Sequence, residues 1–475
     1  MKGKSLMKTR ITFALGIFYA LLPLGAAAES NKAGRPSPPR RVNVVVMMVD
    51  DMGFAGPSIA PYSNPHYQTP GMDRLAREGL LFTDFHSSGT VCSSTRAGLL
   101  TGRYQQRAGV EAVIHPRSDH PEHRKGLQKS EVTFAELFKD AGYVTGIVGK
   151  WHLGYAGENP DYHPQNHGFE FFKGYHSGNI DYINHWGDHM KHDWWHGRKE
   201  TPEEGYTTHL INKYALEFLE QNKDKPFCLY VAHESPHAPV QGPSDPIQRG
   251  PGAKKRTTPH AQAMKQMILE MDQGVDQVRA KLIELGLEKN TLFLFFSDNG
   301  DAPNTATGHP DHRGHKGRVY EGGTRVPAIA WWPGKIAPGS STDALSITLD
   351  VMPTILSVAG IEQPKNRTLD GMDLSPVLFE QKALPARPLY WSSLSNNGLR
   401  SEALRDGPWK LVVQHPKSKP YTFANEQVEL YRLDKDISEE NDLAEKQSAR
   451  AAAMLKQLKA WYAETQETAT HQPGN

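Results

Sequence analysis

Ionisable side chains follow four of the most apolar runs in this 475-residue sequence. In chain order they are Asp50 and Asp51, Lys150 and His152, His237, and Asp298 and Asn299. If the runs are parallel strands, their carboxyl ends lie at one edge of a sheet, where open α/β sheets bind ligands. The sequence therefore predicts that these groups meet in one site.

The oxygen-bearing members of this set indicate a metal site. Asp50, Asp51, Asp298 and Asn299 supply three carboxylates and one amide, which are hard ligands that suit Ca²⁺ or Mg²⁺ and not zinc. Each short motif alone is more often a turn or a helix cap. Three clustered carboxylates would repel one another without a cation, so we expect a bound divalent ion.

The runs that must position these groups predict an α/β fold. Several are apolar at successive positions, which is typical of strands buried on both faces of a parallel sheet. The strands are expected at 43–49, 144–148, 227–232, 291–297 and 326–332, and amphipathic helices at 72–78, 133–141, 209–221, 262–286 and 350–359. This alternation predicts a sandwich with helices flanking a large, mostly parallel sheet.

The last part of the chain has a different pattern. Short strand-like runs at 388–392, 402–405, 409–413 and 429–433 precede one amphipathic helix at 443–463. We predict a catalytic domain over 42–385 and a C-terminal subdomain over 386–475, built as a small antiparallel sheet with one helix.

Composition and the N-terminus limit the class of protein. A chain with 38% hydrophobic residues and a formal charge of +1 is not disordered, and two cysteines exclude a disulfide framework or a zinc ribbon. Basic residues, an apolar run at 11–22 and small residues up to Ala28 predict a signal peptide over 1–28, with a linker at 29–41. The run is short of the roughly 20 residues of a membrane anchor. We expect an exported protein, periplasmic or secreted, that does not bind nucleic acid.

A second motif surrounds Cys92. In the segment 91–103, VCSSTRAGLLTGR, small polar residues before a helical run place Cys92 near a helix N-terminus, where backbone N–H groups stabilise an anion. The segment resembles the type I sulfatase signature, Cys-x-Pro/Ala-x-Arg followed by a Leu-Leu-Thr-Gly-Arg-like run. The resemblance extends in the family's order to 50–51, 149–154, 236–237, 298–300 and 316–327. Ser94 departs from the family's Pro or Ala.

The resemblance implies an alkaline-phosphatase-like fold and a sulfuric ester hydrolase. It implies that a formylglycine-generating enzyme oxidises Cys92 to formylglycine, whose hydrate attacks sulfur beside one Ca²⁺, with Mg²⁺ the less expected ion. The implied catalytic residues are Cys92, Arg96, Lys150, His152, His237 and Lys316, and the implied metal ligands are Asp50, Asp51, Cys92, Asp298 and Asn299. His237 or Lys316 would protonate the leaving group, and His152 would deprotonate the second hydroxyl.

Two segments, the first rich in His, Trp and Tyr and the second rich in His, are expected to form the walls of a sugar site. They are 174–198 and 301–318, within which we expect Asp181, His185, His309 and Arg313 to bind substrate. The pattern at 178–185 is similar to that of polysaccharide sulfatases acting on galactans such as carrageenan. The expected substrate is therefore a sulfated polysaccharide or oligosaccharide.

Two other functions remain open from the sequence. One is a phosphodiesterase or phosphonate monoester hydrolase, which shares the fold and can share the modified cysteine. The other is an inactive sulfated-glycan-binding homologue, left unconverted at Cys92 because of Ser94.

Overall fold

The computed structural model describes residues 41–394, 400–415 and 426–470, and residues 41–475 form one compact unit. The expected signal peptide (1–28) and the linker up to residue 40 lie outside the described residues. The expected boundary at 385/386 falls within this unit, between the helix that ends at Glu380 and the strand that begins at Pro388.

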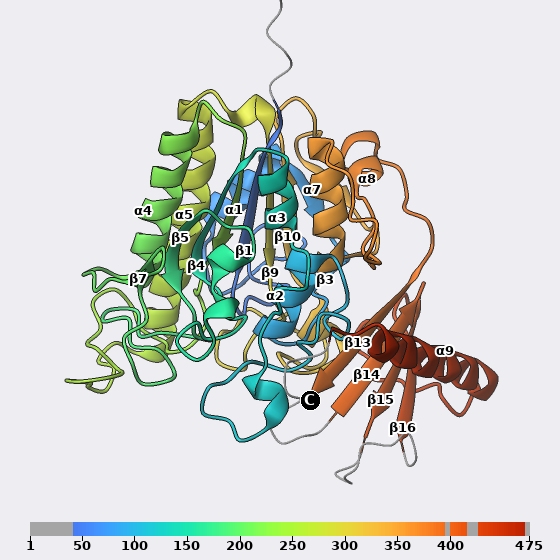
Figure 1. The fold of residues 1–475 in the computed structure, drawn as a ribbon. Helices are drawn as coiled ribbons and strands as arrows, with labels where there is room; N and C mark the ends of the chain where they lie inside the picture. The colour runs from blue at the N-terminus through green and yellow to red at the C-terminus, as the bar shows by residue number, and fades with distance from the viewer. Residues whose placement is uncertain (1–40, 395–399, 416–425, 471–475) are drawn as a thin grey trace, which may run out of the picture. The chain divides into compact units, whose positions relative to one another are not determined.

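A ten-stranded sheet forms the centre of the molecule (Figure 1). Its order is β11 (Ser340–Thr342), β2 (Leu80–Phe82), β10 (Ala328–Trp331), β9 (Thr291–Ser297), β1 (Asn43–Val49), β8 (Phe227–Ala232), β4 (Val144–Lys150), β5 (Phe171–Tyr175), β6 (Trp195–His196) and β7 (Lys199–Glu200). The five strands from β9 to β5 are parallel, whereas β10 runs antiparallel to β9. The predicted α/β architecture, mostly parallel at its centre, is confirmed.

Side chains of β1 alternate between two hydrophobic cores, which explains why the strand is apolar at every position. Val44, Val46 and Met48 pack with residues of α2 (Cys92–Thr101), α3 (Phe134–Asp140), α7 (Val351–Ala359) and α8 (Ser375–Glu380). The intervening Val45, Met47 and Val49 pack with α1 (Pro70–Glu78), α4 (Thr207–Asn222) and α5 (His260–Glu284). Helices therefore cover both faces of the sheet (Figure 1).

Short elements complete this layer. A second sheet pairs β3 (Phe85–His86) with β12 (Ser346–Ile347), and α6 is a single turn (Glu321–Thr324). The 3₁₀ turns are Pro121–Arg124, Pro160–Tyr162, Pro164–Asn166, Glu288–Asn290 and Thr348–Asp350. Cys228, in β8, is buried and has no disulfide partner.

The C-terminal part is an antiparallel sheet with one helix, as predicted. Its strands are β13 (Pro388–Leu394), β14 (Arg400–Asp406), β15 (Trp409–Gln414) and β16 (Gln427–Arg432), in that order, followed by α9 (Ser448–Glu467). The helix begins and ends later than the expected 443–463. A third core joins this sheet to Val319, Tyr320, Ile347 and Leu349 of the main layer.

Buried ion pairs also join the C-terminal sheet to the main layer. Lys410 of β15 is 0% exposed, and its ammonium lies 2.8 Å from Glu321 and 3.1 Å from Glu439. Arg405 of β14 donates to both carboxylate oxygens of Asp84, at 2.7 and 2.6 Å. Because charges removed from water must be paired, these contacts fix the sheet in one position.

Among the described helices, none combines the length and the apolar composition needed to cross a membrane.

Candidate active site

The carboxyl ends of four parallel strands bring the predicted groups together. Asp50 and Asp51 follow β1, Lys150 ends β4, and Asp298 follows β9. The loop after β8 carries His237 to the same edge, 3.5 Å from Asp51. Asp51 and His152 adopt positive φ angles of 66° and 55°, an unusual conformation that is characteristic of residues held in place for function.

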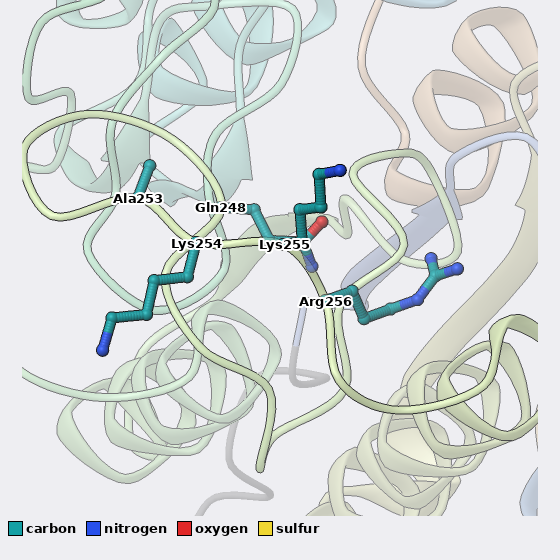
Figure 2. Close-up of a pocket in the computed structure, with 5 residues that line it drawn as sticks. All are labelled: Gln248, Ala253, Lys254, Lys255 and Arg256. Carbon is teal, nitrogen blue, oxygen red and sulfur yellow. The ribbon is translucent and has the colours of Figure 1, made fainter.

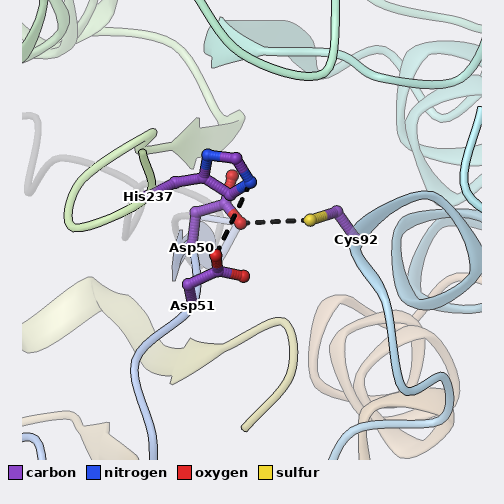
Figure 3. A group of neighbouring side chains, drawn as sticks. All are labelled: Asp50, Asp51, Cys92 and His237. Atoms are coloured by element: carbon purple, nitrogen blue, oxygen red, sulfur yellow. Dashed lines mark hydrogen bonds and ion pairs between the residues drawn. The ribbon is translucent and has the colours of Figure 1, made fainter. Parts of the chain in front are cut away.

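Cys92 is the first residue of α2, and its sulfur faces the Asp50 carboxylate (Figure 3). Its thiol donates to Asp50 Oδ1 at 3.2 Å, and Lys316 Nζ lies 3.3 Å from its sulfur. Burial raises the pKa of this thiol, and the Asp50 carboxylate raises it further. The unmodified side chain is therefore a neutral thiol and a poor nucleophile.

Basic side chains pair with the carboxylates of the site. Lys150 Nζ pairs with Asp50 Oδ2, Arg96 Nη2 lies 3.0 Å from Asp298 Oδ2, and Lys316 Nζ lies 2.5 Å from Asp51 Oδ1. Burial raises the pKa of Asp50, but nearby Lys150 and other cations lower it by more, so the pKa lies well below its usual range. Asp50 is therefore ionised although it is fully buried.

The same group of side chains fits a hard divalent cation. Oxygen atoms of Asp50 and Asp51 lie within 4.8 Å of each other and of ligand atoms of Cys92 and His237. Asn299 donates to Asp51 through its amide nitrogen at 2.8 Å, whereas its buried Oδ1 has no hydrogen-bond partner. An unpaired buried oxygen beside several carboxylates is the donor set that Ca²⁺ or Mg²⁺ uses.

Asp298 adds a third carboxylate to this set. Burial and the nearby Asp50 carboxylate raise the pKa of Asp298 to about 7. Its Oδ1 accepts from the Asp51 backbone N–H at 3.2 Å. Burial is the largest cause of this shift, and repulsion from Asp50 adds to it.

Two histidines lie on either side of Cys92. His152 Nε2 contacts the Ile114 carbonyl at 2.8 Å, so this nitrogen carries the proton and Nδ1 keeps its lone pair. Burial, together with the charge of Lys150, holds the pKa of His152 well below its usual value. Burial and Lys316 lower the pKa of His237 to about 4.

A cavity of about 550 Å³ opens above Cys92. It is lined by Val91, Cys92, Val113, Ile114, His115, His152, Gly178, Asn179, Asp188, His237, His315, Lys316, Gly317, Arg318, Ser393 and Leu394. The last two belong to β13, so the C-terminal sheet forms one wall. Ser393 Oγ also accepts from Thr90 Oγ1 at 2.6 Å, which ties that wall to the segment before Cys92.

Asp181 and His185, expected to bind sugar, do not line this cavity. Both are 0% exposed. Asp181 accepts from five partners around it: the backbone N–H groups of Ile183, Asn184, Gln248 and Arg249, and the Gln241 amide. His185 Nε2 contacts the Gly205 carbonyl at 3.0 Å. The Asp181 oxygens and His185 Nε2 hold the surrounding loops, and neither side chain lines the cavity, so direct sugar contact by these two residues stays a prediction.

His309 and Arg313 also lie away from the cavity. His309 packs edge-on against Phe54, with ring centroids 5.9 Å apart, and lines a separate depression with Asp84 and Arg405. Arg313 donates to Tyr431 Oη at 2.7 Å and to the Glu439 carbonyl at 2.9 Å, and so contacts the C-terminal region. Of the segment 301–318, only its end from His315 faces the cavity.

Several residues that line the cavity were not predicted from the sequence. His115 and Ile114 precede a stretch without regular strands, and Ser393 lies in a small strand of the tail. Asp188 and Asn179 lie inside the segment 174–198, but residue type alone did not separate them from Asp181 and Asp193.

Comparison with known proteins identifies the family. The sulfatase family profile matches residues 42–361, and a profile described as N-sulphoglucosamine sulphohydrolase, C-terminal, matches residues 311–468. The first match spans most of the chain and includes every residue of the strand-end site. The chain therefore belongs to the sulfatase family, and it is an enzyme of the sulfuric ester hydrolase class.

Individual relatives cover most of the chain. It is 36% identical to N-acetylgalactosamine-6-sulfatase of Rattus norvegicus over 81% of its own length and 74% of that protein. It is 34% identical to arylsulfatase A of Bos taurus, with coverages of 79% and 74%. Among solved structures, Ps i-CgsB in complex with k-i-k-neocarrahexaose has a TM-score of 0.78 at 25% identity, covering 91% of this chain and 96% of that one.

Proposed function

We propose that this sulfatase removes sulfate from a sulfated polysaccharide or oligosaccharide, using formylglycine at position 92. The observation that carries the proposal is the place of Cys92, at a helix N-terminus between Asp50 and Lys316 on the floor of the cavity. The N-terminus of α2 and the positive charges of Lys150 and Lys316 favour the binding of a sulfate group.

The modified residue would supply two hydroxyl groups on one carbon. In its hydrated form one hydroxyl takes the sulfuryl group and the other allows its release, which neither a thiol nor a serine can do. Ser94 does not distort the motif, because it is buried and its hydroxyl donates to the Val91 carbonyl at 2.9 Å. We expect conversion despite Ser94, because Arg96, the other fixed residue of the signature, is present.

Asp50, Asp51, Asp298, Asn299 and residue 92 would hold one Ca²⁺, with Mg²⁺ the alternative. The ion would lower the pKa of a bound hydroxyl and stabilise charge on the sulfate oxygens. The unpaired Asn299 Oδ1 and the carboxylates of Asp50 and Asp51 support this assignment.

The remaining side chains have distinct tasks. Lys316, 3.3 Å from the Cys92 sulfur, would bind sulfate oxygens, and Lys316 or His237 would protonate the leaving oxygen. His152 would accept a proton at Nδ1, the nitrogen whose lone pair is free. Arg96 and Lys150 would hold the acidic side chains in place and balance their charge, because they pair with Asp298 and Asp50.

The substrate class is supported by the cavity and by the relatives' names. Hydrogen-bonding groups of Asn179, Asp188, His115 and His315 surround the entrance, which suits a hydroxylated sugar. One relative is named for N-acetylgalactosamine 6-sulfate, and one similar structure holds a neocarrahexaose. We propose a sulfated galactan or amino sugar as substrate, a carrageenan-type chain included.

Mass spectrometry of the Cys92 peptide, from protein made in the native host, tests the modification. A formylglycine mass is expected, together with sulfate release from at least one member of a panel of carrageenan and chondroitin sulfate oligosaccharides. Cys92→Ala, whose methyl side chain cannot be converted to the aldehyde, should release none. An intact thiol in the native protein would overturn the proposal and favour the inactive glycan-binding function.

Comparing kcat/KM on an aryl sulfate and on an aryl phosphonate monoester or phosphate diester tests the other alternative. A clear preference for either phosphorus ester would make phosphodiester or phosphonate hydrolysis the main activity.

We also propose export with removal of residues 1–28, supported by the basic start, the apolar run and the small residues before Glu29. N-terminal sequencing of the protein from the periplasm or the medium should begin at Glu29. A chain that retains Met1 would contradict this proposal.

A further inference from the structure

Four basic residues lie on one loop beside the catalytic cavity. The loop 247–256 contains Arg249, Lys254, Lys255 and Arg256, and it borders an open depression of about 580 Å³. Gln248, Ala253 and the last three basic residues line this depression (Figure 2). The proposed catalytic mechanism uses none of them.

Among the described residues, no carboxylate pairs with the side chains of Lys254, Lys255 and Arg256. Lys254 and Lys255 are exposed, and within the described part of the chain their ammonium groups make no ion pair or hydrogen bond. Arg256 donates only to main-chain oxygens, those of Thr258 at 2.9 Å and Val240 at 3.1 Å. Three adjacent cations without carboxylate partners produce a local positive potential that attracts anions.

The loop is fixed to the wall of the catalytic cavity. Asp181 accepts from the backbone N–H groups of Gln248 at 2.7 Å and Arg249 at 3.0 Å. Arg249 Nη1 donates to the carbonyl oxygens of Asn179 at 3.1 Å and Trp186 at 3.2 Å. Because Asn179 lines the cavity, these hydrogen bonds connect the basic loop directly to the cavity wall.

A backbone hydrogen bond closes the loop on itself. Lys254 N–H donates to the Ile247 carbonyl at 2.7 Å. The backbone that carries the basic residues is therefore held in a short closed turn, so ordering of the backbone adds little entropic cost when a ligand binds.

The three basic side chains diverge from the loop in different directions (Figure 2). A pocket for one anion would have them converge on a common point, as Lys150 and Lys316 do around the strand-end site. Diverging cations instead suit several anionic groups spaced along an extended chain.

We propose that loop 247–256 binds sulfate groups of a polymeric substrate at positions remote from the ester being hydrolysed. This inference rests on the proposed action on sulfated glycans and adds that the preferred substrate is a chain with several sulfates. The loop increases affinity for long substrates and leaves the chemical step unchanged. Asp181 is a positioning residue for it.

Charge reversal at the two exposed lysines tests this site. The variant Lys254→Glu/Lys255→Glu is compared with the control variant Lys289→Glu/Lys335→Glu. The control changes the charge equally, at exposed lysines near the start of β9, whereas the catalytic site lies at the end of that strand. Substrates are polymeric iota-carrageenan and chondroitin sulfate, their shortest sulfated oligosaccharides, and 4-nitrophenyl sulfate. Binding of the two polymers is also measured by calorimetry in a Cys92→Ser background, which needs no turnover.

We expect KM and the dissociation constant for the polymer to rise about tenfold at ~50 mM salt, with kcat unchanged. The effect should shrink at ~0.5 M salt, because exposed charges are then screened. Activity on 4-nitrophenyl sulfate should change less than about twofold, and the control variant should match wild type.

Three results would overturn the loop assignment. They are an equal effect of the control variant, an equal effect on 4-nitrophenyl sulfate, and unchanged polymer binding in the Cys92→Ser background. Failure of the proposed function has a different signature, since wild type would then release sulfate from none of the substrates. The calorimetric measurement would still decide whether the loop binds sulfated chains.

Discussion

His152 is held in one tautomer by the Ile114 carbonyl, so a single nitrogen of its ring can accept a proton. Its positive φ of 55° orients the ring into the cavity wall. A fixed tautomer and ring orientation would favour the proposed role of His152 as a base, because the side chain needs no reorganisation when the reaction occurs.

We predict that His152→Ala lowers kcat on 4-nitrophenyl sulfate by about 10²- to 10⁴-fold, the usual contribution of a general base. A burst of one equivalent of 4-nitrophenol should remain, because the first hydroxyl still attacks sulfur and only release is slowed. Rapid-quench or stopped-flow kinetics measures both quantities. His66→Ala, at an exposed position, should behave as wild type. Loss of the burst along with turnover would assign His152 to the first step instead.

At this scale the sequence predicted which residues meet at the strand ends, but not which residues line the cavity. Asp50, Asp51, Asp298 and Asn299 could be located because each directly follows a buried strand, and strand ends are fixed by the sheet. Asp181 and Asp188 are both in one irregular segment, and only the path of its turns decides that Asp188 faces the cavity while Asp181 is buried. The course of these turns cannot be predicted from a repeating pattern of apolar residues, because the segment has none.

Among the elements, β15 is joined to the main layer through a fully buried lysine. Lys410 lies between Glu321, at the start of α6, and Glu439. Burial raises the pKa of Glu439 to about 7, an effect that Lys410 opposes and Glu321 increases. The lysine therefore separates two carboxylates that would otherwise repel each other in a low dielectric.

Replacing Lys410 with Met should lower the free energy of unfolding by about 3–5 kcal/mol, because buried Glu439 loses its cationic partner while Glu321 keeps only Arg325 and Arg405 among the described residues. Thermal unfolding followed by circular dichroism measures the loss. Lys435→Met, at an exposed position of the same region, should change stability by less than about 0.5 kcal/mol. Adding Glu439→Gln to Lys410→Met should recover part of the loss, and no recovery would show that repulsion is not its cause.

The alternation of apolar runs predicted the central strands β1, β4, β8 and β9 nearly to the residue. It did not show that β10 runs antiparallel to β9, since both directions accept the same buried residues. Nor did it show that β13 supplies Ser393 and Leu394 to the cavity, because packing between distant parts of the chain leaves no local pattern.

For the whole molecule, the metal ion that we propose at the strand-end site would link stability to metal binding. Without a cation, the carboxylates that follow β1 and β9 are balanced only by Arg96, Lys150 and Lys316. An ion that binds only the folded chain stabilises it by about 4.1 kcal/mol at 1,000 times its dissociation constant.

We therefore predict that EDTA lowers Tm by several degrees and that Ca²⁺ restores it more completely than Mg²⁺ at equal concentration. Differential scanning calorimetry of wild type and of Asp51→Asn/Asp298→Asn measures this dependence. The double variant should melt at the same temperature with and without Ca²⁺. A wild-type Tm that is indifferent to EDTA and to both ions would contradict a resident metal ion.

Because β13 lines the cavity beside Cys92 but is synthesised much later, folding around Cys92 is completed only after most of the chain has been made. Thr90 and Ser393, which are hydrogen-bonded beside Cys92, are 303 positions apart in the chain. At ~5–20 residues per second, a ribosome needs about 15–60 s to synthesise the intervening segment. Folding then leaves Cys92 only 1% exposed. The modification that we propose for Cys92 must therefore precede folding. An enzyme that binds residues 92–96 can act only on the growing or still unfolded chain, before β13 packs beside Cys92.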